Sequence, residues 1–184
     1  MTRDDLGRFS QLPVDFESIG LLEPAAPQEP YFCTPADAEP VGRLGCDGIH
    51  FILLPGDERV FCVDPAMGEP GTYVLPVAAD FREFLSFILF CRDANPLSQI
   101  WWMSEERFRG MLTETPEEWP GSEAFFARRD AALAVVAETF GLTPVDPFRK
   151  VKVLQAAFDP TKLHFRMNIM MCSALSANKE VYYV

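Results

Sequence analysis

The segment IHFILLPGDERVFCVD, residues 49–64, holds two short apolar runs on either side of the turn-forming sequence Pro-Gly-Asp-Glu. The first run, residues 49–54, is rich in side chains that favour β-strands. In the second run, residues 59–64, successive side chains alternate as they do when they point to opposite faces of a sheet. Two such runs joined by a Pro-Gly turn predict a β-hairpin.

A third strand and a helix follow the predicted hairpin. Residues 72–78 (TYVLPVA) read as a strand that Pro76 restricts to the edge of a sheet or ends early. Asp80 then stands at an N-cap position and has Glu83 three residues later, as in a capping box. The apolar side chains that come next have helical spacing: Phe81, Phe84, Leu85 and Ile88. Phe87, Leu89 and Phe90 add apolar surface to the other sides, so we predict a helix over residues 80–91 that is covered on more than one face.

Three further helices are predicted after this one. Ser104, followed by two glutamates, begins a helix that extends to about residue 113. Ser122 begins a longer helix that ends at Gly141, and Asp146 with Pro147 begins the last. Because the strands come first and the helices afterwards, we expect an α+β fold. Its antiparallel sheet of short strands packs against helices, and its C-terminal part is a helical elaboration.

Both ends of the chain are less regular in sequence. Residues 1–48 are rich in proline, glycine and acids, which predicts irregular chain with one short helix. The final stretch, residues 167–184, carries a cluster of methionines and ends in Val-Tyr-Tyr-Val. Three interpretations of this stretch stay open: a partner-dependent or swapped tail, a final strand packed on the body, and a chance extension.

The composition excludes several classes of protein. With 184 residues, 48% of them hydrophobic and 23% charged, the chain is long enough for one domain with a sizeable core. Its net charge of −11 argues against nucleic acid as a partner and is compatible with attraction to a basic protein. The longest apolar run, residues 84–91, is too short for a membrane span, so we expect no membrane partner.

The cysteines and the first residues favour the cytoplasm. The five cysteines are odd in number and form no Cys-x-x-Cys pair, which is typical of reduced thiols. The opening MTRDDLGRF lacks a basic region followed by an apolar stretch, so no secretory signal is expected.

No arrangement of residues in the chain is a strong catalytic motif. Cys46 and His50 are close in sequence and have the side chains of a zinc site or a nucleophile–base pair, but no second ligand pair lies nearby. Asp57 and Glu58 fit a turn, yet they could also face a partner. We therefore predict no catalytic residues, no cofactor and no metal.

A second group of candidate partner-binding residues lies around the double tryptophan. Trp101 and Trp102 are adjacent, so in extended chain they point to different sides, and Trp102 is a candidate interface anchor. Burial of both rings is the simpler expectation. Glu105 and Glu106 suit the start of a helix and could also attract a basic partner.

The part of the chain from residue 45 to residue 112 resembles the SUKH superfamily of Smi/Knr-like proteins. The resemblance rests on CDGIHFILLPGDERVFCVDP (46–65), on GTYVLPVAADFREFLSFIL (71–89) and on WWMSEERFRGML (101–112). In that family a strand ending in a Pro-Val-Ala segment leads into a helix, as residues 76–85 do here. The resemblance implies a single α+β domain over residues 1–184, with residues 114–184 as a helical extension.

The resemblance also implies a function. Bacterial members of the superfamily commonly act as immunity proteins that bind and neutralise toxins, whereas fungal relatives act as regulatory scaffolds. We therefore expect a non-enzymatic module that binds a protein partner such as a basic toxin domain, with Trp102, Glu105, Glu106, Asp57 and Glu58 as candidate contacts. The alternatives are a small-ligand-binding or regulatory scaffold protein and a Cys/His-dependent hydrolase that uses Cys46 or Cys62 with His50.

Overall fold

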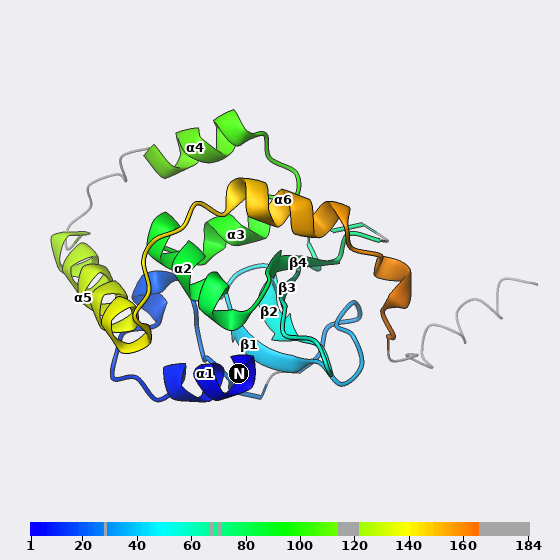
Figure 1. Cartoon of the computed structure of the whole chain (residues 1–184), viewed down its shortest axis with the longest axis horizontal. Helices are drawn as coiled ribbons and strands as arrows, with labels where there is room; N and C mark the ends of the chain where they lie inside the picture. Colours follow the sequence, from blue (N-terminus) through cyan, green and yellow to red (C-terminus); the bar gives the residue numbers. More distant parts are fainter. Residues whose placement is uncertain (28, 67, 70, 114–121, 166–184) are drawn as a thin grey trace, which may run out of the picture.

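A four-stranded antiparallel sheet with helices packed against it makes this an α+β protein (Figure 1). We describe it from a computed structural model. The structure describes residues 1–27, 29–66, 68–69, 71–113 and 122–165. The expected fold class is thus confirmed.

The sheet has the strand order β1-β2-β3-β4, so each strand pairs with its neighbour in sequence. Strands β2 (His50–Leu53) and β3 (Val60–Val63) form the predicted hairpin, with His50 opposite Val63. Strand β4 (Val74–Ala78) pairs with β3 and holds Pro76 at the edge, as expected from its missing N–H group. Strand β1 (Glu39–Arg43) lies at the opposite edge.

Backbone and side-chain contacts cover the two edge strands. At the β1 edge, Leu22 and Arg43 exchange backbone hydrogen bonds of 2.8 and 3.1 Å, and the Ala25 N–H donates to the Val41 carbonyl. At the β4 edge, helix α6 (Phe148–Ala156) packs against the strand, and the Gln155 amide donates to the Pro76 carbonyl.

Both faces of the sheet are covered. Every residue of β2 and β3 is therefore buried. The inner face, which includes Phe51 and Cys62, joins the main helical core. The outer face, which includes Ile52 and Phe61, belongs to a second, smaller cluster. Segments near Cys33 and Leu163, together with Phe158, cover this outer face.

Helix α2 (Phe81–Cys91) is the central helix of the main core. Asp80 caps it by accepting from the Glu83 N–H at 2.8 Å, and the Glu83 carboxylate accepts from the Ala79 N–H. Eight of its eleven side chains are buried, because strand β4 and helices on three other sides contact it. The predicted N-cap and the predicted burial on more than one face are confirmed.

The other helices surround α2 and the sheet in the arrangement of Figure 1. Their bounds are α1 (Thr2–Phe9), η1 (Glu17–Ile19), α3 (Asn95–Gln99), α4 (Glu105–Thr113), α5 (Ser122–Phe140) and η2 (Pro160–Lys162). Helices α4, α5 and α6 match the three predicted C-terminal helices closely. Strand β1 was not predicted, because residues 1–48 were expected to hold no strand, and α3 was missed as well.

Candidate functional site

The outer face of the sheet carries an apolar hollow of about 300 Å³. The hollow lies between the loop at Phe32, the start of β4 and the chain that follows η2. Its lining residues are Phe32, Cys33, Gly71, Tyr73, Val74, Pro160, Leu163 and Phe165. The two walls are joined by backbone contacts, because the Ala36 N–H donates to the His164 carbonyl at 2.7 Å and Pro35 bridges to Phe165.

Aromatic side chains line this hollow or follow a lining residue in sequence, and three of them are exposed. Phe32 is 60% exposed, Tyr31 48% and Phe165 46%, although large apolar side chains usually avoid water. Phe32 meets Tyr73 edge to face, with ring centroids 5.3 Å apart. We call Tyr31, Phe32, Tyr73 and Phe165 the aromatic rim. Clustered aromatic side chains of this kind are typical of protein interfaces.

The wall of the hollow carries no charge at neutral pH. Cys33 is the one lining residue with a titratable thiol, and it is only 3% exposed. Burial raises the pKa of its thiol to about 11, so the thiol stays protonated and neutral. The hollow therefore suits apolar groups.

Four exposed acidic residues lie beside the aromatic rim: Glu29, Asp37, Asp47 and Glu69. Glu29 and Asp47 each line a surface depression together with Tyr31, and the Glu69 carbonyl accepts from the Tyr73 N–H. Within the described ranges, none of the four forms an ion pair, whereas many other acids of the chain do. We call them the acidic border; Arg43 also lines both depressions, where it is paired with Glu23.

A second, more polar hollow of about 540 Å³ adjoins the first and shares Leu163 with it. Asp57 and Asp37 line it, together with Arg59 and Lys162. The Arg59 guanidinium lies 5.1 Å from the centroid of Phe61 and donates to the Asp57 carboxylate at 2.6 Å. This side of the outer face therefore carries mixed charges, of which Arg59 and Asp57 are paired with each other.

His50 packs against Tyr31 of the aromatic rim. Its Nδ1 lies 2.7 Å from the Gly48 carbonyl oxygen, which can only accept, so Nδ1 carries the proton. Its Nε2 lies 3.2 Å from the Thr34 hydroxyl, which can donate to it. Tyr31 stacks on the imidazole with ring centroids 5.6 Å apart. Gly48 has φ 71°, a conformation that favours glycine, and a Cβ there would lie 2.6 Å from the Tyr31 ring.

Acidification should destabilise the protein through His50. Burial lowers the pKa of this imidazole below its ordinary value, so between the two pKa values the unfolded chain binds a proton that the folded chain does not. The free energy of unfolding should therefore fall as the pH drops below about 6.5, by at most about 1.4 kcal/mol per pH unit for one proton. Urea unfolding at pH 7.5 and 5.5 measures this.

The matched variant is His50→Asn, which removes the titrating ring. Its unfolding free energy should change less over the same pH interval than that of the wild type. Equal changes in the two proteins would show that carboxylates alone account for the pH dependence.

Cys46 and His50 line one surface depression, but among the described residues the hydrogen-bond partners of the imidazole are Gly48 and Thr34 and not a thiol. Both ring nitrogens of His50 are engaged, with Gly48 and with Thr34. The Cys46 thiol is exposed. Cys62 belongs to the inner face of the sheet, whereas the His50 side chain contacts the loop over the outer face, so the sheet separates them. Burial also raises the pKa of the Cys62 thiol.

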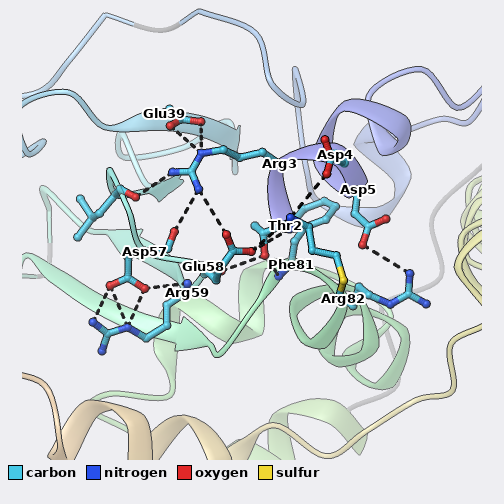
Figure 2. A network of polar contacts seen from close by, with 12 residues as sticks. Thr2, Arg3, Asp4, Asp5, Glu39, Asp57, Glu58, Arg59, Phe81 and Arg82 are labelled. Atoms are coloured by element: carbon cyan, nitrogen blue, oxygen red, sulfur yellow. Dashed lines mark hydrogen bonds and ion pairs between the residues drawn. The ribbon is translucent and has the colours of Figure 1, made fainter.

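The structure places Asp57 and Glu58 in the β2–β3 turn, where they hold the start of helix α1. Figure 2 shows Arg3 reaching from α1 toward this turn and toward Glu39. The Arg3 guanidinium donates to the Glu39 carboxylate at 2.9 Å and lies 3.7 Å from that of Glu58. The Thr2 N–H donates to Glu58 at 2.9 Å, and this bond lowers the pKa of Glu58.

The Asp57 carboxylate also accepts its hydrogen bonds from within the chain, from Arg59. Burial raises the pKa of this carboxyl group, but hydrogen bonds from the Arg59 side chain and N–H outweigh burial and hold it below its usual value. Both carboxylates of the turn therefore serve contacts within the chain. Their role in partner binding stays a prediction that the geometry does not favour.

Trp102, Glu105 and Glu106 lie at helix α4, away from the hairpin turn; Figure 1 places α4 and α1 on opposite sides of α6 and α2. Trp102 is 36% exposed and has the Arg107 guanidinium 4.6 Å from its ring centroid. The expectation that both tryptophans are buried is thus wrong for Trp102. The five candidate residues do not form one surface.

The two glutamates of α4 differ in their contacts. Glu105 accepts from Arg109 at 2.8 Å, which lowers its pKa, and it lies 3.4 Å from Arg149. Glu106 is exposed and has no ion pair in the part of the chain that the structure describes. Glu106 therefore remains available to a partner, whereas Glu105 links α4 to α6.

The aromatic rim has no signature in the local sequence, for a physical reason. Phe32 lies in the proline-rich segment, and Phe165 lies near the opposite end of the chain. No local period links them, because only the folding of both segments over the outer face brings them together.

Comparisons with protein-family models, with curated proteins and with solved structures found no match to this chain. Among the described residues, no helix combines the length and apolar character needed to cross a membrane. The same residues contain no group of three or more side chains placed to hold a metal ion.

Proposed function

We propose that this protein is a non-enzymatic binding module that attaches to a basic toxin domain and neutralises it, as bacterial immunity proteins do. The resemblance to the SUKH superfamily motivates the proposal. The order of elements supports it, since β2, β3, β4 and α2 follow one another as the quoted segments require. A protein of this kind needs a contact surface rather than reacting groups.

The aromatic rim with its acidic border is the observation that carries the proposal. Exposed rings such as Phe32 and Tyr31 supply rigid apolar contact area, and acids without an internal partner attract basic side chains. A basic toxin domain would place apolar side chains on the rim and Lys or Arg side chains against Asp47 and Glu69. Binding at a functional surface of the toxin would then block its substrate.

The test compares two exposed apolar residues. Full-length tagged protein captures candidate partners from cell extracts and from a panel of purified bacterial toxin domains, and the affinity of the one that binds is measured. Phe32→Ser should weaken binding about tenfold or more, because aromatic anchors contribute strongly to interfaces. Val153→Ser should leave it unchanged, since Val153 is 68% exposed on α6 and lines neither hollow.

Salt provides a second readout of the same complex. Raising the sodium chloride concentration from about 50 to about 500 mM should slow association, because the acidic border acts through long-range attraction.

Each of the two tests has an outcome that contradicts the proposal. Equal effects of Phe32→Ser and Val153→Ser on the affinity would show that the rim is not the contact surface. An association rate that does not change with salt would remove the acidic border from the proposal.

The apolar hollow gives some support to the small-ligand alternative, because its volume is at the lower end of those of ligand pockets. Native mass spectrometry distinguishes the two. A bound apolar molecule of low mass, with no toxin domain captured, would favour that alternative.

A further inference from the structure

A short loop of the aromatic rim covers the imidazole of His50. His50 is 4% exposed at the start of β2, where Tyr31 stacks on its ring and the Thr34 hydroxyl lies 3.2 Å from Nε2. We call residues 31–34 the rim loop. The Tyr31 N–H donates to the Thr34 hydroxyl oxygen and the Thr34 N–H donates to the Tyr31 carbonyl, both at 2.9 Å. One imidazole therefore contacts both ends of a loop that is closed on itself.

The hydrogen bonds of the Thr34 hydroxyl suit a neutral imidazole. Its oxygen accepts from the Tyr31 N–H, and its proton is directed to the unprotonated Nε2 of His50, since Nδ1 carries the ring proton. A proton added to Nε2 would turn this nitrogen into a donor, and the hydroxyl proton would lose its acceptor. The added charge would also lie in a buried place, where an unpaired charge is costly.

Charged and titratable groups lie near His50 on several elements. The rim loop contributes Tyr31, β1 contributes Arg43, the turn before β2 contributes Cys46 and Asp47, and the chain after β3 contributes Asp64. Arg43 is paired with Glu23 at 2.7 Å, and the Asp64 carboxylate accepts from the Ala66 N–H at 3.1 Å. Within the described residues, the ring nitrogens of His50 bond instead to an uncharged carbonyl and an uncharged hydroxyl. Burial therefore dominates and lowers the pKa of the imidazole.

We propose that the rim loop is a gate that opens when Nε2 of His50 takes up a proton, and that this opening withdraws Tyr31 and Phe32 from the aromatic rim. In the open form the imidazole is in water, where its pKa returns to about 6.5. The open form therefore binds a proton over a pH range in which the closed form does not. The ratio of open to closed molecules rises as the pH falls below about 6.5, by at most about tenfold per pH unit.

The rim loop is the part of this surroundings that opens at the lowest cost. The strand partners of His50, Arg43 on β1 and Val63 on β3, are held in the sheet. In the loop, by contrast, Phe32 is already 60% exposed, and Cys33 is the side chain that opening removes from the outer cluster. Segments with few buried contacts open locally at a lower free energy than the whole domain.

The effect on a partner rests on the proposed function, because the gate controls binding only if the rim is the contact surface. Affinity would then fall in proportion to the closed fraction. The opening itself needs no partner, so it is tested on the protein alone. A failure to find a toxin domain would therefore leave the result on the gate in place.

Amide hydrogen exchange of the full-length protein, followed by mass spectrometry, measures the opening. Protection factors, corrected for the intrinsic exchange rate at each pH, are compared for peptides that cover the rim loop and helix α2. The rim loop should be protected at least about a hundredfold less than α2, because it opens without global unfolding. Between pH 7.5 and 5.5 its protection should fall about fivefold, within the tenfold limit for one proton.

The two histidines of the chain supply matched variants. His50→Gln keeps an acceptor for the Thr34 hydroxyl but does not titrate, so its rim loop should lose less than twofold of its protection over the same interval. His164 is exposed and its carbonyl accepts from the Ala36 N–H, which makes it the other histidine next to the loop. His164→Asn should therefore behave as the wild type does. His50→Asn is a second non-titrating variant should His50→Gln not fold.

Three results would overturn the proposal. Equal protection of the rim loop and α2 would show that His50 is uncovered only by global unfolding. A rim loop whose protection does not change with pH would show that protonation does not open it. The same loss of protection in the wild type and in the non-titrating variants would assign the pH dependence to other groups.

Discussion

Replacing Phe84 by alanine should lower the free energy of unfolding by about 3–5 kcal/mol, the usual range for a buried phenylalanine. Phe84 is fully buried on α2. Its ring centroid lies 4.9 Å from that of Phe51 on β2 and 6.1 Å from that of Phe81. The side chain therefore joins the central helix to the inner face of the sheet, and its loss would leave a cavity between them.

Urea unfolding followed by circular dichroism measures this effect. Phe32→Ala is the matched control, because it removes the same atoms from a ring that is 60% exposed and should cost less than about 1 kcal/mol. Since domains of this kind are stable by about 5–15 kcal/mol, the Phe84 variant should lose a large share of its stability. Similar losses in the two variants would contradict the assignment of Phe84 to the core.

Gly20→Ala should lower the free energy of unfolding by about 3 kcal/mol. Gly20 ends η1 with φ 69°, a conformation that alanine adopts at a cost. A Cβ there would lie 2.3 Å from the carboxylate oxygen of Asp93, which accepts from the Asn95 N–H at 2.7 Å. The Ala94 N–H donates to the Ile19 carbonyl, so the two backbones cannot separate freely.

Gly56→Ala separates the cost of the positive φ from the cost of the contact with Asp93. Gly56 has a similar φ of 72°, but a Cβ there would meet no heavy atom within 4 Å. This variant should therefore show the backbone strain alone, about 1 kcal/mol. Thermal unfolding of both variants beside the wild type gives the comparison. If the two melt together, the close approach of Asp93 to Gly20 would have no energetic consequence.

Much of the central fold can be predicted because its signals are local. The hairpin of β2 and β3 follows from two apolar runs around a Pro-Gly turn, and the start of α2 follows from Asp80 and Glu83. Each signal depends on residues within a few positions of one another. The helical period of α2 likewise predicted that the helix would be enclosed.

Strand β1 could not be predicted in the same way. Its sequence, Glu-Pro-Val-Gly-Arg, has one large apolar residue and contains both a proline and a glycine. It is a strand because β2 offers it hydrogen-bonding groups, and an irregularity between Pro40 and Gly42 accommodates the two residues. The tertiary pairing overrides the weak local preference.

The candidate site was predicted less well than the fold. Trp102 and Glu106 are exposed as partner residues should be, whereas Asp57, Glu58 and Glu105 bond within the chain. The pairing of a turn acid with Arg3, from a distant helix, has no signature in the local sequence. For the same reason the local sequence does not predict the aromatic rim. The segments that carry Phe32 and Phe165 come together only when both fold over the outer face.

The covered edges of the sheet bear on how the protein behaves when it is crowded. An open edge strand offers unpaired N–H and carbonyl groups to other molecules, and it is a common starting point for fibrils. Here the backbone of Leu22 and Ala25 forms hydrogen bonds with β1. Pro76 and helix α6 protect the edge of β4. Folded molecules at high concentration should therefore stay dispersed, and fibril growth should require prior local unfolding at one of these edges.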